Sequence, residues 1–399
     1  MLKNIYLAGG VRTPFGSFQG ALAKLSAGQL GGVAIKGSLE RCGVDPTAVD
    51  EVLFGNVIGA GLGQNVARQA ALGAGLPISC GATTINKVCG SSLRAVVLAA
   101  QAIQCADAGL IVAGGCESMT NAPYLLSKAR GGYRMGHGAL IDSMIHDGLW
   151  DVYNDKHMGS CGDQCAHKYG FTREDQDTYS VESYQRALAS WEEGFFEEGI
   201  VPVELKSRGG TSVFRRDEDV AKFAGEEKLR SLRPAFGPES TITAGNASGI
   251  CDGAAAMLVF DDERKDKLNI NPAARLMGHA NVAMEPDWFT IAPIAAIKKL
   301  CGQLELSPEQ VDLYEINEAF AVVAMAAIRE LNLKRDQVNV AGGAVAIGHP
   351  IGATGARIVN TLIRALQRRE KRIGIACLCI GGGEATAVAV ERCVQSGRA

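Results

Sequence analysis

Residues 86–92 read NKVCGSS, and the expected fold is organised around this stretch. Residues 83–85 before it are β-branched and typical of the end of a buried strand, whereas residues 93–106 form an apolar, alanine-rich run with helical character. Cys89 is therefore expected on a strand-to-helix turn. Free backbone N–H groups and the positive end of the helix dipole favour a thiolate there, which predicts a nucleophilic sulfur. The alternative is a buried structural cysteine, which is the commoner role for this residue type.

Two further turns carry chemical groups of the same kind. Residues 339–357 form a glycine-rich stretch that runs into another expected helix and contains His349, one of only six histidines. The strand-like run 373–378 is followed by Cys379 and by the glycines 381–383. Two cysteines and a histidine, each in a glycine-rich turn after a strand, indicate nucleophilic and proton-transfer chemistry.

Composition narrows the class of protein. The 399 residues are 47% hydrophobic, enough for large cores and for about two to four domains. A formal net charge of −3, without a basic stripe, favours small-molecule partners over nucleic acid. Twelve cysteines spread through apolar segments fit a reducing compartment. No export signal is visible and no apolar run approaches the roughly 20 residues of a membrane span, so we expect a cytoplasmic protein.

Strands and helices alternate along the first part of the chain. We expect strands at residues 4–8, 51–54 and 110–115, and helices at residues 26–42 and about 65–74. This alternation indicates an α/β fold and favours a mostly parallel sheet that is covered on both faces.

The C-terminal part repeats this plan. A strand expected at residues 311–316 precedes Asn317, as the strand at residues 51–54 precedes Asn56. Asn56 and Cys89 are 33 positions apart, and Asn317 and His349 are 32 apart. The spacing suggests a duplicated unit whose two strand-to-helix turns meet.

Between the two halves, residues 116–249 are more polar and more charged, as expected for a lid or an insertion. We expect a helix over residues 173–194 and a strand over residues 201–205 within it.

From the VRTPFG motif at residues 11–16 to the motif that begins at Cys379, the chain resembles the thiolases, and specifically their acetoacetyl-CoA branch. The resemblance implies a duplicated, layered αβαβα core with an inserted loop domain. Its halves would be an N-terminal one over residues 1–118 and 250–270 and a C-terminal one over residues 271–399, with the loop domain over residues 119–249 covering the coenzyme A site.

The resemblance also implies an activity, that of an acetyl-CoA C-acetyltransferase. Such an enzyme joins two acetyl-CoA into acetoacetyl-CoA and CoA, reversibly, through an acetyl-cysteine. Coenzyme A thioesters would be the substrates, no metal or redox cofactor is implied, and the assembly would be a homodimer or a homotetramer. A 3-ketoacyl-CoA thiolase of broader chain length and a non-catalytic scaffold that binds acyl-CoA are the alternatives.

By resemblance, Cys89 is the acylated nucleophile, His349 takes its proton, and Cys379 is the acid and base at the α-carbon. Backbone amides of Cys89 and Gly381 would form one oxyanion hole. His349 and a water held by Asn317 would form the other.

The resemblance places substrate-binding residues in and after the lid. Ser248, His157 and Met158 would line the pantetheine channel. Ala221 stands where many thiolases have an arginine for the nucleotide end of the coenzyme, and Lys222, next to it, would substitute as a point charge.

We also assign Phe289 and Phe320 to substrate binding. The bulky ring of Phe289, next to Trp288, is expected to limit acyl-chain length. Cys251 stands where the thiolases that the chain resembles usually have an asparagine, and Glu384 lies in a turn that is often uncharged in those proteins.

Two other kinds of site are less consistent with the sequence. The glycines of residues 342–355 imitate a dinucleotide-binding loop, but no acidic residue that ends a strand follows about 20 residues later. Cys161, Cys165 and His167 lack the second ligand pair of a zinc site, so we expect no metal centre.

Overall fold

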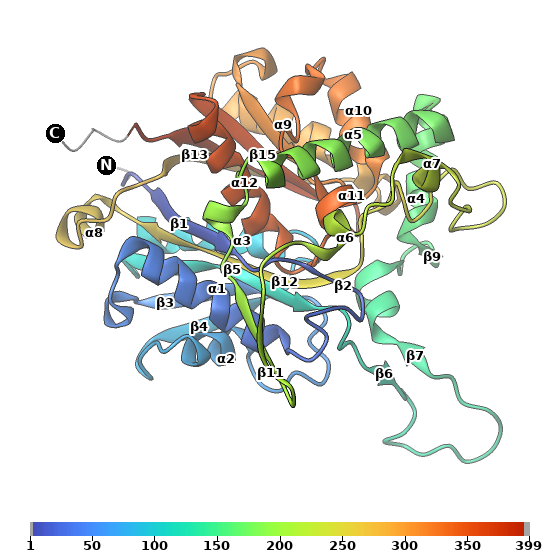
Figure 1. The fold of residues 1–399 in the computed structure, drawn as a ribbon, viewed down its shortest axis with the longest axis horizontal. Coiled ribbons are helices and arrows are strands. Elements are labelled where there is room, and N and C mark those ends of the chain that lie inside the picture. Colours follow the sequence, from blue (N-terminus) through green and yellow to red (C-terminus); the bar gives the residue numbers. More distant parts are fainter. Residues whose placement is uncertain (1–2, 395–399) are drawn as a thin grey trace.

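Short apolar strands build one large sheet at the centre of the computed structural model, which describes residues 3–394 (Figure 1). The strand order is β14-β15-β16-β13-β1-β12-β5-β3-β4. The first group of strands is β1 (Tyr6–Arg12), β3 (Glu51–Gly55), β4 (Gly81–Ile85), β5 (Leu110–Ser118) and β12 (Cys251–Phe260), with β2 (Gly16–Ser17) paired to β12. The second group is β13 (Ala274–Ala283), β14 (Leu313–Ile316), β15 (Ile373–Ile380) and β16 (Glu384–Arg392).

The sheet is mixed, so the expectation of a mostly parallel sheet was wrong. Parallel pairing joins β3 to β4, β3 to β5 and β14 to β15, whereas β1, β12, β13 and β16 pair antiparallel with their neighbours. Residues 381–383 explain one of these pairs. This short turn joins β15 to β16 as a hairpin, and strands joined by so short a connection are antiparallel.

The two halves of the sheet repeat each other. The order β1-β12-β5-β3 in one half corresponds to β13-β16-β15-β14 in the other. A parallel bridge between Tyr314 and Val338 occupies the place that β4 has beside β3. The halves join where Tyr6 and Leu7 of β1 pair with β13. The predicted duplication is confirmed.

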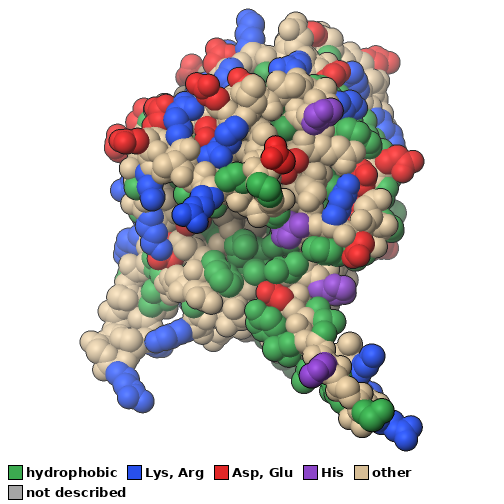
Figure 2. Space-filling model, turned by 90° about the vertical axis from the view of Figure 1, so that its right-hand side faces the viewer, with side chains coloured by type: hydrophobic (Ala, Val, Ile, Leu, Met, Phe, Trp, Pro, Cys, Tyr) green, Lys and Arg blue, Asp and Glu red, His purple; other side chains and the backbone are tan. Residues whose placement is uncertain are grey.

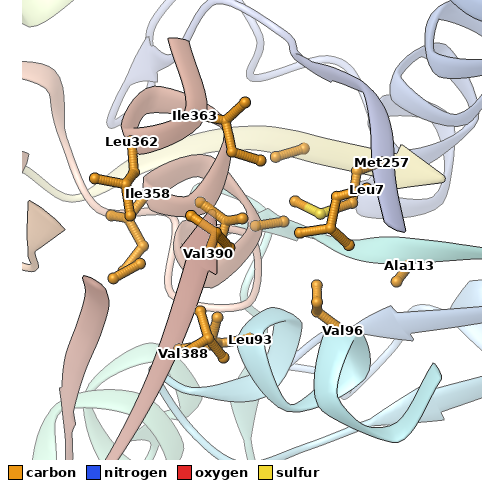
Figure 3. Packing of buried hydrophobic residues seen from close by; sticks show 14 of the residues in the cluster. Leu7, Leu93, Val96, Ala113, Met257, Ile358, Leu362, Ile363, Val388 and Val390 are labelled. Atoms are coloured by element: carbon orange, nitrogen blue, oxygen red, sulfur yellow. The ribbon is translucent and has the colours of Figure 1, made fainter. Parts of the chain in front are cut away.

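Helices complete five layers. α3 (Ser91–Gln104) and α12 (Thr354–Arg368) lie side by side between the two halves of the sheet, and Figure 3 shows their apolar residues meeting those of β1, β12 and β16. The outer layers are α1 (Ala27–Cys42) with α2 (Val66–Gly73) on one side and α9 (Ala292–Gln303) with α10 (Ala321–Glu330) on the other. Separate hydrophobic clusters fill the central and the two outer interfaces, which gives the predicted αβαβα core.

Strand β4 differs from the sequence-based expectation. We predicted a buried strand end at residues 83–85, but β4 is the last strand of the sheet and its residues are exposed or half-buried. Because a β-branched run also occurs at sheet edges, the sequence does not distinguish the two positions.

The strands within residues 119–249 form separate two-stranded sheets and do not join the large sheet. The expected helix is α5 (Arg173–Glu192), with Thr172 and Asp175 forming its capping box, and the expected strand is β10 (Val203–Ser207), paired with β11 (Gly210–Phe214). The remaining elements here are β6 (Tyr124–Leu125), β7 (Ile141–Asp142), β8 (Trp150–Asp151), β9 (Lys156–His157), α4 (Met158–Tyr169), α6 (Glu218–Ala221) and α7 (Glu226–Arg230). The β6–β7 arm extends away from the body of the protein (Figure 1).

None of the helices within residues 3–394 has the length and apolar character needed to cross a membrane.

Candidate active site

The loop before α3 presents Cys89 where the helix begins. The Ser91 hydroxyl accepts a hydrogen bond from the Lys87 N–H at 2.9 Å and donates to the Val88 carbonyl at 2.6 Å, which closes the turn. A Cβ atom at Gly90 would lie 2.4 Å from the side chain of Ile380 of β15, so a larger residue here would require that side chain to move.

The Cys89 thiol is protonated at neutral pH, contrary to the expectation of a thiolate. Loss of water around the thiol raises the pKa of Cys89 to about 11, although the backbone N–H groups of Gly381 and of Cys89 itself lower it. Desolvation therefore outweighs the helix end. The same two amides that we predicted for an oxyanion hole converge on this sulfur.

His349 is buried and held in one tautomer. Its Nδ1 lies 2.7 Å from the hydroxyl of Thr354, and that hydroxyl lies 3.0 Å from the Pro350 carbonyl, which can only accept. The hydroxyl thus donates to Pro350 and accepts from Nδ1–H, so Nε2 carries the free lone pair. Burial, with a contribution from Arg357, lowers the pKa of His349 to about 3, and the ring is neutral.

Asn317 follows β14 and faces this lone pair. Its Nδ2 lies 3.4 Å from His349 Nε2, and its Oδ1 accepts from Arg357 at 3.3 Å. Arg357 also lies 3.5 Å from the carboxylate of Glu315. The guanidinium fixes the orientation of the Asn317 amide, which leaves the amino group directed at the histidine.

Cys379 completes the cluster from the other half of the sheet. Burial raises the pKa of this thiol well above its usual range, and the neighbouring Cys89 sulfur raises it further. The starts of α3 and α12 are also tied together, because the Ala356 N–H donates to the Ser92 hydroxyl at 3.0 Å. The duplicated turns therefore meet, as their spacing predicted.

A cavity of about 720 Å³ leads toward this cluster from the surface. Leu149 and Ile250 line it and pack against the same hydrophobic cluster as Cys89. Gly249, another lining residue, accepts a hydrogen bond from the His349 N–H at 3.0 Å. Figure 2 shows hydrophobic side chains gathered in a hollow on this face, with a histidine at its rim.

Four of the predicted binding residues line the cavity: His157, Lys222, Ser248 and Phe320. The His157 ring lies 4.5 Å from that of Phe236, and its Nδ1 accepts from the Gly159 N–H, so Nε2 carries the proton of the neutral ring.

Met158 and Phe289 are not among the lining residues. Met158 packs beside Gly381, where a Cβ would lie 3.2 Å from its methyl carbon. Phe289 is only 3% exposed and belongs to the cluster under α9 and α10, so the structure does not bring it to the cavity.

Several residues that line the cavity were not predicted from the sequence. Tyr184 and Phe223 stack at 4.4 Å between ring centroids, and Asp219 and Lys228 lie beside them. These residues come from α5 and from the segments around α6 and α7, and no motif links them in the sequence.

The three side chains of α4 considered as metal ligands differ in burial. Cys161 and Cys165 are buried in the core, whereas His167 is exposed. Cys161 does lie near the carboxylates of Asp151 and Asp287, within 4.8 Å.

Comparison with known proteins identifies the family. The model for the N-terminal domain of thiolase matches residues 5–263, and the model for its C-terminal domain matches residues 270–392. The chain belongs to the thiolase family. Among its thiolase relatives, acetyl-CoA acetyltransferase 2 of Arabidopsis thaliana is 49% identical, covering 98% of this chain and 97% of the relative. The acetyl-CoA acetyltransferase of Cupriavidus necator is 48% identical, covering 98% and 100%.

Solved thiolase structures superpose closely. The Bacillus anthracis acetyl-CoA acetyltransferase gives a TM-score of 0.95 at 39% identity, covering 98% of this chain and 99% of that one. The Acat5 thiolase from Ascaris suum, solved in complex with coenzyme A, gives 0.92 at 43% identity, covering 98% and 100%. The fold that the sequence predicted is thus that of a thiolase.

Proposed function

We propose that this thiolase is an acetyl-CoA C-acetyltransferase, which condenses two acetyl-CoA into acetoacetyl-CoA and CoA and catalyses the reverse cleavage. One observation carries the proposal. Cys379 lies close to Cys89, and the N–H of His349 donates to Gly249, which lines a cavity that opens to solvent. Its relatives named acetyl-CoA acetyltransferase cover nearly the whole chain.

Acylation begins with the sulfur of Cys89. As it attacks the thioester carbonyl of the first acetyl-CoA, its proton moves to Nε2 of His349. The amides of Cys89 and Gly381 stabilise the developing oxyanion. When the intermediate collapses, the coenzyme sulfur leaves and takes the proton of Cys379. The products of this half-reaction are acetyl-Cys89, free CoA, a Cys379 thiolate and a protonated His349.

Condensation restores every proton. The thiolate of Cys379 removes a proton from the α-carbon of the second acetyl-CoA. The thioester carbonyl oxygen of this acetyl-CoA accepts hydrogen bonds from His349 and from a water held by Asn317. The carbanion attacks acetyl-Cys89, acetoacetyl-CoA forms, and the released Cys89 sulfur recovers its proton from His349. Neither a metal nor a redox cofactor enters these steps.

The cavity supplies the coenzyme site in this proposal. His157, Ser248 and Phe320 would contact the pantetheine arm, and Lys222 would interact with the phosphates at the mouth, where Lys228 adds a second positive charge. Both lysines are exposed, so they would act as point charges in place of the arginine absent at Ala221.

Mass spectrometry of the intact protein after mixing with acetyl-CoA tests the roles. Wild type should gain one acetyl group, Cys89→Ala none, and Cys379→Ala should acetylate slowly without cleaving acetoacetyl-CoA. Cys377→Ala is the matched control, because Cys377 is a buried cysteine on the same strand. Coenzyme binding without acetylation of wild type would instead favour the non-catalytic scaffold. Faster cleavage of 3-ketohexanoyl- or 3-ketooctanoyl-CoA would favour a thiolase of broader chain length.

We further propose a homodimer or homotetramer. Strand β4 has a free edge, and exposed Leu72 and Ile78 lie just before it in the chain. The β6–β7 arm exposes Tyr124, Leu126 and Met135, a second apolar surface. Light scattering of variants with charged residues at each surface would separate the two interfaces.

The domain division and the compartment belong to the same proposal. We divide the chain into an N-terminal half at 1–118 and 250–270, a loop domain at 119–249, and a C-terminal half at 271–399. A cytoplasmic location is supported by twelve free cysteines and by 48% identity to the cytosolic acetyl-CoA acetyltransferase ERG10 of Gibberella zeae.

A further inference from the structure

A second cavity of about 730 Å³ shares no lining residue with the coenzyme cavity. Its lining residues come from β1, the end of α1, α12 and the end of β16. The pairing of β1 with β12 shifts register between Ala8 and Val11, and Gly9 in this bulge has a φ of +62°. The bulge bends the strand edge and contributes to the cavity wall.

Positive charge dominates the lining. Arg41, Arg364 and Arg392 line the cavity, and Glu198 is the only carboxylate among the lining residues within 3–394. Arg364 binds one oxygen of this carboxylate at 2.7 Å. Arg368, just outside the lining, binds the other at 3.0 Å. Both oxygens of Glu198 are therefore already engaged by arginines.

The other two arginines are held by carbonyl groups. Arg41 donates to the backbone oxygen of Glu198, and Arg392 Nε donates to the Lys371 carbonyl at 2.7 Å. Carbonyl partners orient a guanidinium without neutralising it, so the cluster keeps a surplus of positive charge.

Burial makes this surplus unfavourable in the absence of a ligand. The side chain of Arg364 is only 11% exposed. Burial lowers the pKa of Arg364 to about 10, and the nearby Arg41 contributes to the same direction. Because the buried Arg364 lies beside other positive charges, it gains most from an anion that carries more than one negative charge.

We propose that this cavity binds a small multivalent anion, either phosphate-bearing or a polycarboxylate, through Arg41, Arg364 and Arg392. Guanidinium groups bind both classes with paired hydrogen bonds. The amides of Asn269, Asn271 and Gln367 line the same space and offer neutral donors. The volume falls in the range of small-molecule sites, roughly 300–1,000 Å³.

Calorimetric titration of the full chain at constant ionic strength tests the site, with inorganic pyrophosphate and citrate as probes. We expect at least one probe to bind. The ratio of the affinities for pyrophosphate and citrate identifies the class of anion that the cavity prefers. Arg364→Gln and Arg41→Gln should weaken binding at least tenfold. The matched control is the double variant Lys222→Gln with Lys228→Gln, which removes the positive charges of the coenzyme cavity and should leave this binding unchanged.

Two results would overturn the proposal. One is the absence of binding by either probe up to millimolar concentration. The other is binding that survives Arg364→Gln and disappears in the lysine double variant, since the anion would then occupy the coenzyme cavity. Arg392→Gln decides the question if Arg364→Gln does not fold, because Arg392 makes no contact with Glu198.

Discussion

Replacing Thr354 by valine should disable His349 without touching any reacting atom. Thr354 is fully buried, and valine has nearly the same shape, so the change removes a hydroxyl and little else. The Nδ1–H of His349 loses its acceptor, whereas the Pro350 carbonyl keeps its bond from the Ala353 N–H at 2.8 Å. The ring is then free to turn or to adopt the Nε2–H tautomer, which cannot accept the proton of Cys89.

The expected decrease in the rate of acylation follows from the free energy of the lost hydrogen bond. A buried donor left without a partner costs about 1–3 kcal/mol. If this cost appears in the transition state for acylation, kcat falls by about 5- to 150-fold. The rate of acetyl-enzyme formation from acetyl-CoA, followed by rapid-quench mass spectrometry, measures the step directly. Thr354→Ser keeps the hydroxyl and should restore most of the rate.

Thr361→Val is the matched control on the same helix. The Thr361 hydroxyl is buried and donates to the Arg357 carbonyl at 3.0 Å, but it does not touch the histidine. Equal slowing of acylation in both variants would mean that α12 is generally perturbed. Thr354→Val with a rate within twofold of wild type would refute the role of this hydroxyl in selecting the tautomer.

Three further predictions concern other parts of the site. Because burial lowers the pKa of His349 to about 3, kcat/KM for acylation should show no inflection near pH 6.5. Between about pH 6.5 and pH 3 only the unfolded chain binds a proton at this histidine, so the free energy of unfolding should fall as the pH falls through that range. A pH series of acylation rates tests the first expectation, and a pH series of urea unfolding tests the second. Lys222→Gln with Lys228→Gln should raise KM for acetoacetyl-CoA several-fold and leave kcat unchanged, as steady-state kinetics would show. Glu117 accepts from the N–H groups of Val57, Ile58 and Gly352, so Glu117→Gln leaves donors unpaired and should lower the free energy of unfolding by about 2 kcal/mol or more; an unchanged urea midpoint would contradict this.

The sequence could predict those parts of the site that depend on local backbone conformation. A glycine-rich turn after a strand is visible at Cys89, at His349 and at Cys379, and the matching spacing of Asn56 and Asn317 indicated that the turns meet. What could not be predicted depends on packing between distant segments. Tyr184 and Phe223 form one wall of the cavity only because α5 and the residues after α6 come together in the folded chain.

The protonation of Cys89 shows the same limit in energetic terms. The sequence displays the helix end, which lowers the pKa of a thiol, but not the burial of this thiol in the folded chain, which removes water and raises its pKa. The two effects oppose each other, and the burial comes from residues distant in the chain, in the cluster of Val57, Ile58, Met119, Met144 and Ile351 against which Cys89 packs. A local motif therefore predicts where the nucleophile lies and not its charge.

In the resting site, the pKa values of Cys89 and His349 disfavour a pair of thiolate and imidazolium ions. Cys89 holds its proton to about pH 11 and His349 accepts one only near pH 3. Burial causes both shifts, and burial also strengthens any hydrogen bond to an oxyanion, because the surroundings screen charge less than water does. In the proposed mechanism, proton transfer is thus unfavourable until a thioester carbonyl lies against the amides of Cys89 and Gly381, where the negative charge passes from sulfur to oxygen. If Cys89 is the nucleophile that we propose, such a site keeps the thiol protonated between turnovers and activates it only when acyl-CoA is bound.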